Sequence, residues 1–344
     1  LGIMAFGWKR ISPKMHLFAT SMVAFGASLS AFWIMVANSW MHTPAGGYFE
    51  NGKFMITSNF EAIFNPDMYW GVSHMWVACL EISLFVIGGL SAWYILKNRE
   101  TGFFLTSFKI AAAAAVVITP LQIWLGDGSG ISAFKYQPAK LAAMELHWET
   151  NRQGEPAPWH IAAWPDVKNE RNCWEIDVPY GLSLVTTRSL TGQVTGLRDI
   201  PAAERPPLAI TFYAFRAMIA AGFALFFLMA WTVWAWYRGR LRPETASGQR
   251  LLMWSWIIAI PLSYIAMETG WIVREVGRQP WVIYGMMRTS EGASELPVAA
   301  VGTSMFVFSS IYALLFILFL FFSWTVIRKG PDLASPVIAP LRRK

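Results

Sequence analysis

Charged residues are scarce in this 344-residue chain: Asp, Glu, Lys and Arg make up only 14% of it, whereas 55% is hydrophobic. Soluble domains carry about 25% charged residues, so the composition indicates a membrane protein. Cysteine is almost absent. Cys79 lies in an apolar segment and Cys173 in a polar one, so we expect no intramolecular disulfide and no cysteine metal site. Tryptophan is abundant, as expected where a chain meets two membrane interfaces.

The sequence also lacks a signal-peptide pattern, a detectable internal repeat and an initiator methionine. Residues 1–8 resemble the last turns of a helix that is already under way. We therefore expect the chain to be part of a longer protein, truncated at its N-terminus.

Six apolar runs are each long enough to cross a membrane, which takes about 20 residues. They cover residues 16–41, 69–96, 104–125, 208–237, 251–276 and 298–327. The sequence thus predicts an all-α polytopic membrane bundle of six complete transmembrane helices plus the end of another. The small residues 111–115 favour close helix packing, and Pro120 is expected to kink the third span or end it early.

Residues 126–207 are polar and rich in Pro, Glu, Asp and Arg, which predicts a long water-exposed loop of the kind that is usually functional. The predicted division is therefore helices over 1–125, this loop over 126–207, helices over 208–328 and a tail over 329–344. Basic residues concentrate in the tail and in the short loops on its side of the membrane. The positive-inside rule then places the tail in the cytoplasm and the long loop in the periplasm. This distribution explains the net charge of +7 without nucleic-acid binding.

A histidine and a methionine lie within spans that begin on the same side of the membrane. His74 follows the start of the second span by about five residues, and Met218 follows the start of the fourth by about ten. Taken singly, His74 can bond a neighbouring helix carbonyl and Met218 can simply pack. Together, imidazole and thioether can ligate a six-coordinate haem iron and raise its potential.

Ionisable residues at membrane depth are costly and often mark functional sites. Glu275 ends the fifth span, where it can pair with an arginine or bind a weakly ligated haem iron. Arg216 requires an anionic partner, either a haem propionate, Glu275 or another acid. Glu81 and Glu268 can carry protons or bond within the bundle.

The beginning of the long loop holds a lysine and an acid on one apparently helical stretch. Lys140 and Glu145 can be ordinary solvated charges. Beside a membrane redox site, such a pair can instead hydrogen-bond a quinol and accept its proton.

Several of these motifs together resemble one family, subunit I of the cytochrome bd-type quinol oxidases, over essentially the whole chain. Residues 270–281 (GWIVREVGRQPW) match the long family signature GWxxxExGRQPW, which is highly specific. Residues 29–41 (LSAFWIMVANSWM) are similar to a second family stretch, LSALWILVANGWM. Residues 126–130, 140–145 and 148–150 resemble the start of the quinol-binding loop, and residues 215–218 (FRAM) resemble an FRxM segment.

The resemblance implies a terminal oxidase that oxidises quinol at the periplasmic face, reduces dioxygen to water and takes protons from the cytoplasm. His74 and Met218 would ligate a low-spin b haem, supported by Arg216, and Glu275 would ligate a high-spin b haem. Lys140 and Glu145 would act in quinol oxidation. The remaining cofactor-binding positions implied by the signature are Trp271, Arg278, Gln279 and Trp281.

The resemblance further implies haem d, an oxidase subunit II and a small single-span accessory subunit as partners, and the bacterial inner membrane as location. In the family the haem d ligand lies on helices that precede residue 1, so we expect this segment alone to be inactive. The rather short loop is similar to that of the short-loop, cyanide-insensitive branch.

Two rival interpretations remain open at this stage. A b-type cytochrome that only transfers electrons would keep His74 and Met218 but would not need Glu275 and its signature. A transporter that uses Glu81 and Glu268 as proton sites would hold no haem, and the signature argues against it.

Overall fold

The computed structural model describes residues 1–7, 10–50, 53–331 and 333. Lys9, one of the predicted loop cations, and residues 332 and 334–344 of the predicted tail lie outside the described residues.

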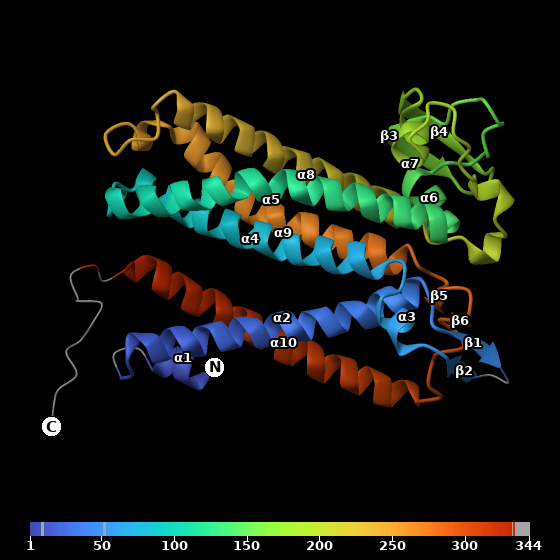
Figure 1. Ribbon diagram of the computed structural model, residues 1–344, viewed down its shortest axis with the longest axis horizontal. Helices are drawn as coiled ribbons and strands as arrows, with labels where there is room; N and C mark the ends of the chain where they lie inside the picture. The colour runs from blue at the N-terminus through green and yellow to red at the C-terminus, as the bar shows by residue number, and fades with distance from the viewer. Residues whose placement is uncertain (8–9, 51–52, 332, 334–344) are drawn as a thin grey trace. The chain divides into compact units, whose positions relative to one another are not determined.

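Long helices dominate the structure, and three short antiparallel hairpins interrupt them (Figure 1). The helices are α1 (Gly2–Phe6), α2 (Pro13–His42), α3 (Asn59–Ile63), α4 (Met68–Leu96), α5 (Thr101–Tyr136), α6 (Pro138–Glu145), α7 (Gly181–Thr187), α8 (Leu208–Tyr237), α9 (Arg250–Val276) and α10 (Val298–Lys329). The strands are β1 (Gly47–Glu50), β2 (Lys53–Ile56), β3 (Trp159–Asp166), β4 (Arg171–Val178), β5 (Trp281–Ile283) and β6 (Met287–Arg288), paired in that order.

Six helices of the described chain are long and apolar enough to cross a membrane: α2, α4, α5, α8, α9 and α10. They coincide with the six predicted spans, which confirms the all-α membrane bundle. The helices form because a segment without access to water must satisfy its own backbone hydrogen bonds. The short helix α1 stands where the end of a preceding helix was expected.

The chain divides into two compact units, of which residues 32–291 form the larger and residues 1–31 with 292–344 the smaller. The smaller unit contains α1, the first part of α2 and α10. Every predicted site residue lies in the larger unit, which is described on its own below.

Trp256, near the start of α9, is fully buried where α4, α5, α8 and α9 pack together. Its ring centroid lies 5.0 Å from that of Phe85 on α4 and 4.9 Å from that of Phe108 on α5. Its indole N–H donates to Thr232 Oγ1 on α8 at 2.9 Å, and Gly88 on α4 leaves room for the ring. One buried tryptophan on α9 thus contacts all three neighbouring helices, and its only polar group is satisfied.

The third span is longer than predicted, because α5 continues through Pro120 to Tyr136. The helix thus continues across the boundary that we drew between residues 125 and 126, and Pro120 does not end it early. Polar side chains in the added turns find partners: Ser129 bonds back to the Leu125 carbonyl, and Ser132 donates to Asp67. A helix tolerates such residues when neighbouring groups satisfy them.

The long loop is folded and its first helix is buried. Small residues of α6, among them Ala142 and Ala143, pack on Phe212 of α8. Strands β3 and β4 form a hairpin in which His160 and Ala163 face inward. The hairpins were not predicted, and α6 is less exposed than a water-facing loop helix would be.

Candidate functional site

Helix α6 begins against the ends of α2 and α9. Just before it, Gln137 donates from Nε2 to the His42 carbonyl at 2.8 Å, and the same nitrogen lies 2.9 Å from His42 Nδ1. One turn later, Lys140 donates from Nζ to the Arg274 carbonyl at 3.1 Å. The start of α6 is therefore bound to the helix end that carries the predicted signature.

Helix α6 ends against α8. Glu145 forms an ion pair with Nη2 of Arg216, and both side chains are largely buried. The guanidinium also lies over the rings of Phe212 and Trp159, at 4.7 and 5.2 Å from their centroids. The eight-residue helix α6 thus connects the C-terminal end of α9 with the N-terminal part of α8, with Lys140 near one end and Glu145 at the other.

Glu275 is held by three polar neighbours at the end of α9. Oε1 accepts a hydrogen bond from Asn38 Nδ2 at 2.7 Å, and Oε2 pairs with Arg278 Nη2 at 2.5 Å. His42 Nε2 lies 3.9 Å from Oε1. The carboxylate is 37% exposed, and two such contacts leave further lone pairs free to bind another group.

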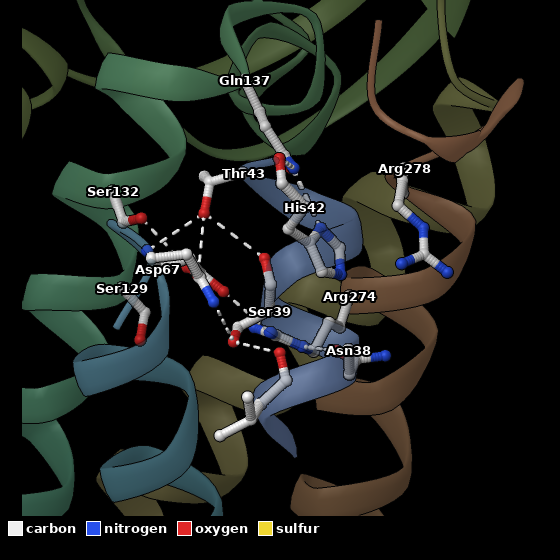
Figure 2. Close-up of polar contacts among 12 residues, drawn as sticks. Asn38, Ser39, His42, Thr43, Asp67, Ser129, Ser132, Gln137, Arg274 and Arg278 are labelled. Carbon is white, nitrogen blue, oxygen red and sulfur yellow. Dashed lines mark hydrogen bonds and ion pairs between the residues drawn. The ribbon is translucent and has the colours of Figure 1, made fainter. Parts of the chain in front are cut away.

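Arg274, the residue before Glu275, points instead towards α2 and α4 (Figure 2). Its Nε donates to Asn38 Oδ1 at 2.5 Å, and its Nη2 pairs with Asp67 Oδ2 at 2.7 Å. Ser132 of α5 donates to the other oxygen of Asp67 at 2.9 Å. Asn38 therefore joins Arg274 and Glu275, with its carbonyl accepting from one and its amide donating to the other.

Burial changes the pKa values of three site residues that lie outside the membrane-spanning helices, Lys140, Glu145 and Asp67. Burial and, to a lesser extent, the charge of Arg274 together lower the pKa of Lys140 to about 7, against the attraction of Asp67. Burial raises the pKa of Glu145, although Arg216 opposes this shift. Burial also acts to raise the pKa of Asp67, but Arg274, His42 and Lys140 together outweigh it and hold that pKa below its usual range. Lys140 can thus exchange a proton near neutral pH, which an exposed lysine cannot do.

The predicted haem ligands belong to a different part of the unit, and neither takes part in the hydrogen bonds just described. His74 faces α5, where its Nε2 lies 3.4 Å from Gln122 Nε2. A Cβ on Gly126 would stand 3.3 Å from the imidazole Cε1. Met218 faces α9, where a Cβ added to Gly270 would stand 3.1 Å from the Met218 sulfur. Each predicted ligand therefore lies next to a glycine of the neighbouring helix.

Several buried nitrogens of these residues have no hydrogen-bond partner among the described residues. They are Nδ1 of His74, Nη1 of Arg216, and Nε and Nη1 of Arg278. Leaving such groups unpaired costs about 1–3 kcal/mol each. Iron offered to His74 and haem propionates offered to each arginine would satisfy them, so the residues present fit haem as a cofactor.

The remaining signature residues have separate contacts. Trp271 packs against a cluster on α2 and α4 that includes Met35 and Val72. Gln279 Oε1 accepts from Thr289 Oγ1 at 2.6 Å, and the Trp281 ring carries the Arg288 guanidinium at 4.9 Å from its centroid. Gln279 and Trp281 thus contact the β5–β6 hairpin region, while Arg278 contacts Glu275.

The two acids of the transporter interpretation differ in environment. Glu81 is buried within α4 at 8% exposure, whereas Glu268 is exposed on α9. They do not form one buried proton site.

Sequence reasoning missed four polar residues that hold this site together: Asn38, His42, Asp67 and Gln137. Asn38 lies inside the stretch that carries the resemblance, and an acid just before an apolar span, as at Asp67, is itself unusual. Gln137 could have been noticed as the residue that precedes Pro138, where a helix can begin.

Comparisons with known proteins give one consistent answer. Residues 1–331 match the family described as cytochrome bd terminal oxidase subunit I. The chain is 34% identical to cytochrome bd ubiquinol oxidase subunit 1 of Bacillus subtilis (strain 168), over 96% of this chain and 72% of the relative. It is 29% identical to cytochrome bd-II ubiquinol oxidase subunit 1 of Escherichia coli (strain K12), over 96% of this chain and 76% of the relative.

A solved structure gives the same result. The bd oxidase from Geobacillus thermodenitrificans superposes with a TM-score of 0.83 at 32% identity. That alignment covers 96% of this chain and 74% of the other.

Proposed function

The chain belongs to the cytochrome bd terminal oxidase subunit I family, and from this premise we propose that it oxidises quinol and passes the electrons to haems for the reduction of dioxygen to water. Membership makes the chain a subunit of a respiratory terminal oxidase, an oxidoreductase of the inner membrane that depends on haem. The observation that carries the finer proposal is the position of α6, which places buried Lys140 and Glu145 against the helices of the predicted haem ligands.

For the low-spin b haem we propose His74 and Met218 as axial ligands. The unpaired Nδ1 of His74 and the glycines beside both side chains support this assignment. When bound, the haem supplies reversible one-electron transfer, and histidine–methionine ligation raises its potential. Arg216 lies two residues before Met218, and its unpaired Nη1 can hold a propionate.

For the high-spin b haem we propose Glu275 as the ligand. Asn38 and Arg278 orient its carboxylate, and the unpaired nitrogens of Arg278 can hold a propionate. Trp271, Gln279 and Trp281 would then shape the protein around this haem. Haem d, the third cofactor that the family resemblance implies, remains part of the proposal for the assembled oxidase.

Quinol is oxidised between the two ends of α6, where Lys140 and Glu145 accept its protons. The Lys140 amine, which burial keeps neutral above about pH 7, takes one hydroxyl proton of the quinol. Glu145 takes the other, since burial raises the pKa of its carboxyl and a quinol proton is then held there transiently. The two electrons would leave the ring one at a time for the bound haems, each of which accepts one electron, so quinone is released with the protons still on the protein.

The proposal also sets the orientation and partners. The basic short loops place the long loop with α6 in the periplasm and the tail in the cytoplasm. Protons from quinol then leave outward while those for water come from the cytoplasm, which contributes to the proton gradient. An oxidase subunit II and a small single-span subunit are the proposed partners, with quinol and dioxygen as substrates.

Membranes that contain the oxidase test this proposal through Lys140→Met. The wild-type rate of quinol-driven haem reduction should rise as pH increases through about 7, because Lys140 becomes a proton acceptor there. The variant should lose this rise and react roughly a hundredfold more slowly. Lys135→Met, at an exposed lysine in the last turn of α5, is the matched control and should retain the wild-type profile.

Two results would contradict the proposal. One is a Lys140→Met profile identical to that of the wild type. The other is haem reduction without any uptake of oxygen by the assembled wild-type oxidase, which would indicate a b-type cytochrome that only transfers electrons.

A further inference from the structure

One face of the β3–β4 hairpin carries a histidine and two carboxylates that the proposed function does not use. His160 and Asp177 are paired residues on the two strands, and Glu175 lies two residues from Asp177 on β4. His160 Nδ1 lies 2.6 Å from Asp177 Oδ1 and 3.8 Å from Glu175 Oε2. Asn172 holds Glu175 in place with a hydrogen bond of 2.9 Å. This cluster is outside the membrane-spanning helices.

The cluster is connected to the quinol-oxidising end of α6 through Arg216. While its Nη2 pairs with Glu145, the Nε of Arg216 donates to the main-chain carbonyl of His160 at 2.8 Å. Glu145 and the main chain of His160 therefore contact the same guanidinium group. Arg216 itself cannot carry a proton onward, since a guanidinium stays protonated.

The exposure of these side chains increases in steps from Glu145 to the surface. Glu145 and His160 are each 5% exposed, Asp177 is 27% exposed and Glu175 is 44% exposed. A proton accepted by Glu145 is therefore largely shielded from bulk water. His160 is the buried titratable group that contacts carboxylates with access to solvent.

His147, which follows α6 closely in the chain, is another ionisable neighbour of His160. Burial, followed by the charge of His160, lowers the pKa of His147 to about 4. His147 thus remains neutral at physiological pH and does not compete for the proton.

We propose that His160 is the proton-release residue of the quinol-oxidising site, which receives the proton that Glu145 takes from quinol and passes it to Asp177 and Glu175 at the surface. This inference rests on the proposed function. In each step one proton moves: the Glu145 carboxyl loses it, the His160 imidazole gains it, and a carboxylate of β4 delivers it to water. The electrons take the separate path to the haem.

Imidazole suits this role for two reasons. It is the side chain whose charge changes most readily near neutral pH, and it has two ring nitrogens, so one can accept a proton while the other donates. Arg216 holds the main chain of His160, which keeps the ring in place relative to Glu145.

The test follows a single turnover of the complete oxidase with quinol, recording haem reduction optically and proton release with a pH-indicating dye. His160→Gln and Asp177→Asn should both slow proton release and haem reduction by roughly tenfold or more, with the KM for quinol unchanged. Glu155→Gln, an exposed acid of the same loop, should behave as the wild type. Unaltered haem spectra and Tm values would establish that the variants are folded.

Zinc gives a readout that a purely structural histidine would not produce. The ligand atoms of His160, Glu175 and Asp177 lie within 4.8 Å of one another, and Zn²⁺ binds imidazole and carboxylate. Zn²⁺ should therefore slow proton release in the wild type and in Glu155→Gln, but not further in His160→Gln.

Wild-type proton release in folded His160→Gln and Asp177→Asn, with zinc equally inhibitory, would overturn this inference and leave the proposed function intact. A wild-type oxidase whose haem is not reduced by quinol would overturn both.

Discussion

Arg216 and Glu145 form an ion pair from which water is largely excluded, with 13% and 5% of their side chains exposed. Two phenylalanines and a tryptophan surround the guanidinium with their rings. Removing one partner of a buried pair leaves the other charge uncompensated, and this costs more than the pair itself contributes. The pair therefore matters for stability as well as for the proposed chemistry.

Arg216→Gln should lower the free energy of unfolding by about 3–5 kcal/mol, because Glu145 is left buried without its cation. The exposed pair of Arg198 and Glu149 offers the matched control. Arg198→Gln should cost less than about 1 kcal/mol. Thermal denaturation of the purified oxidase, followed by tryptophan fluorescence, compares the two. Equal losses of Tm would show that the Arg216 pair is not buried in the oxidase.

At this scale the sequence indicated that Arg216 needs a partner but did not indicate which residue provides it. Arg216 was expected to need an anion, and Glu145 supplies it from 71 positions away. Such a pairing depends on how α6 lies across the helix ends, which no local pattern encodes. Asn38 and Asp67 were missed for the same reason, because each acts through contacts with distant residues, among them Arg274.

Among the elements, the added turns of α5 show how close helix packing depends on glycine. Gly128 faces α4, where the Trp70 ring occupies the space that a side chain would need, with atoms 2.2 Å from an added Cβ. Gly130, two residues later on the same helix, has nothing within 4 Å. The first glycine permits the contact between helices, whereas the second is not required for it.

Gly128→Ala should therefore destabilise the oxidase by about 1–3 kcal/mol through overpacking. Gly130→Ala should be neutral or stabilise it by up to about 1 kcal/mol, because alanine favours the helix. The Tm of each purified variant measures the difference. Equal effects of the two substitutions would mean that Trp70 does not pack on α5 as described.

The sequence predicted those helices that are recognised by a long apolar run. It did not predict helical turns whose polar residues bond to partners distant in the chain. All six spans were found, yet the end of α5 was missed because its glycines, aspartate and serines are typical of a loop. The β3–β4 hairpin was missed because Pro165, within its first strand, argues against a strand in the sequence. A two-stranded sheet has only edge strands, and an edge strand tolerates proline.

For the whole molecule, the distribution of basic residues between the loops of the six helices predicts one orientation in the inner membrane. The structure supplies a native reporter of that orientation, since Cys173 on β4 is a free, exposed thiol in the long loop. The other described cysteine, Cys79, is on a membrane helix.

In intact cells, a membrane-impermeant maleimide should label the wild type, because the long loop is expected in the periplasm. Cys173→Ser should abolish this labelling and thereby assign it to the loop rather than to Cys79. Labelling that requires permeabilised cells would reverse the proposed orientation, and with it the outward release of protons.

The reduced-minus-oxidised visible spectrum of the assembled oxidase tests the central claim most directly, with His74→Ala compared with the wild type and with Glu268→Gln, a change at an exposed acid of α9. The account predicts b-haem bands in the wild type and in Glu268→Gln, and a specific loss of the low-spin component in His74→Ala. Retention of every band in His74→Ala, or the absence of haem from all three proteins, would contradict it.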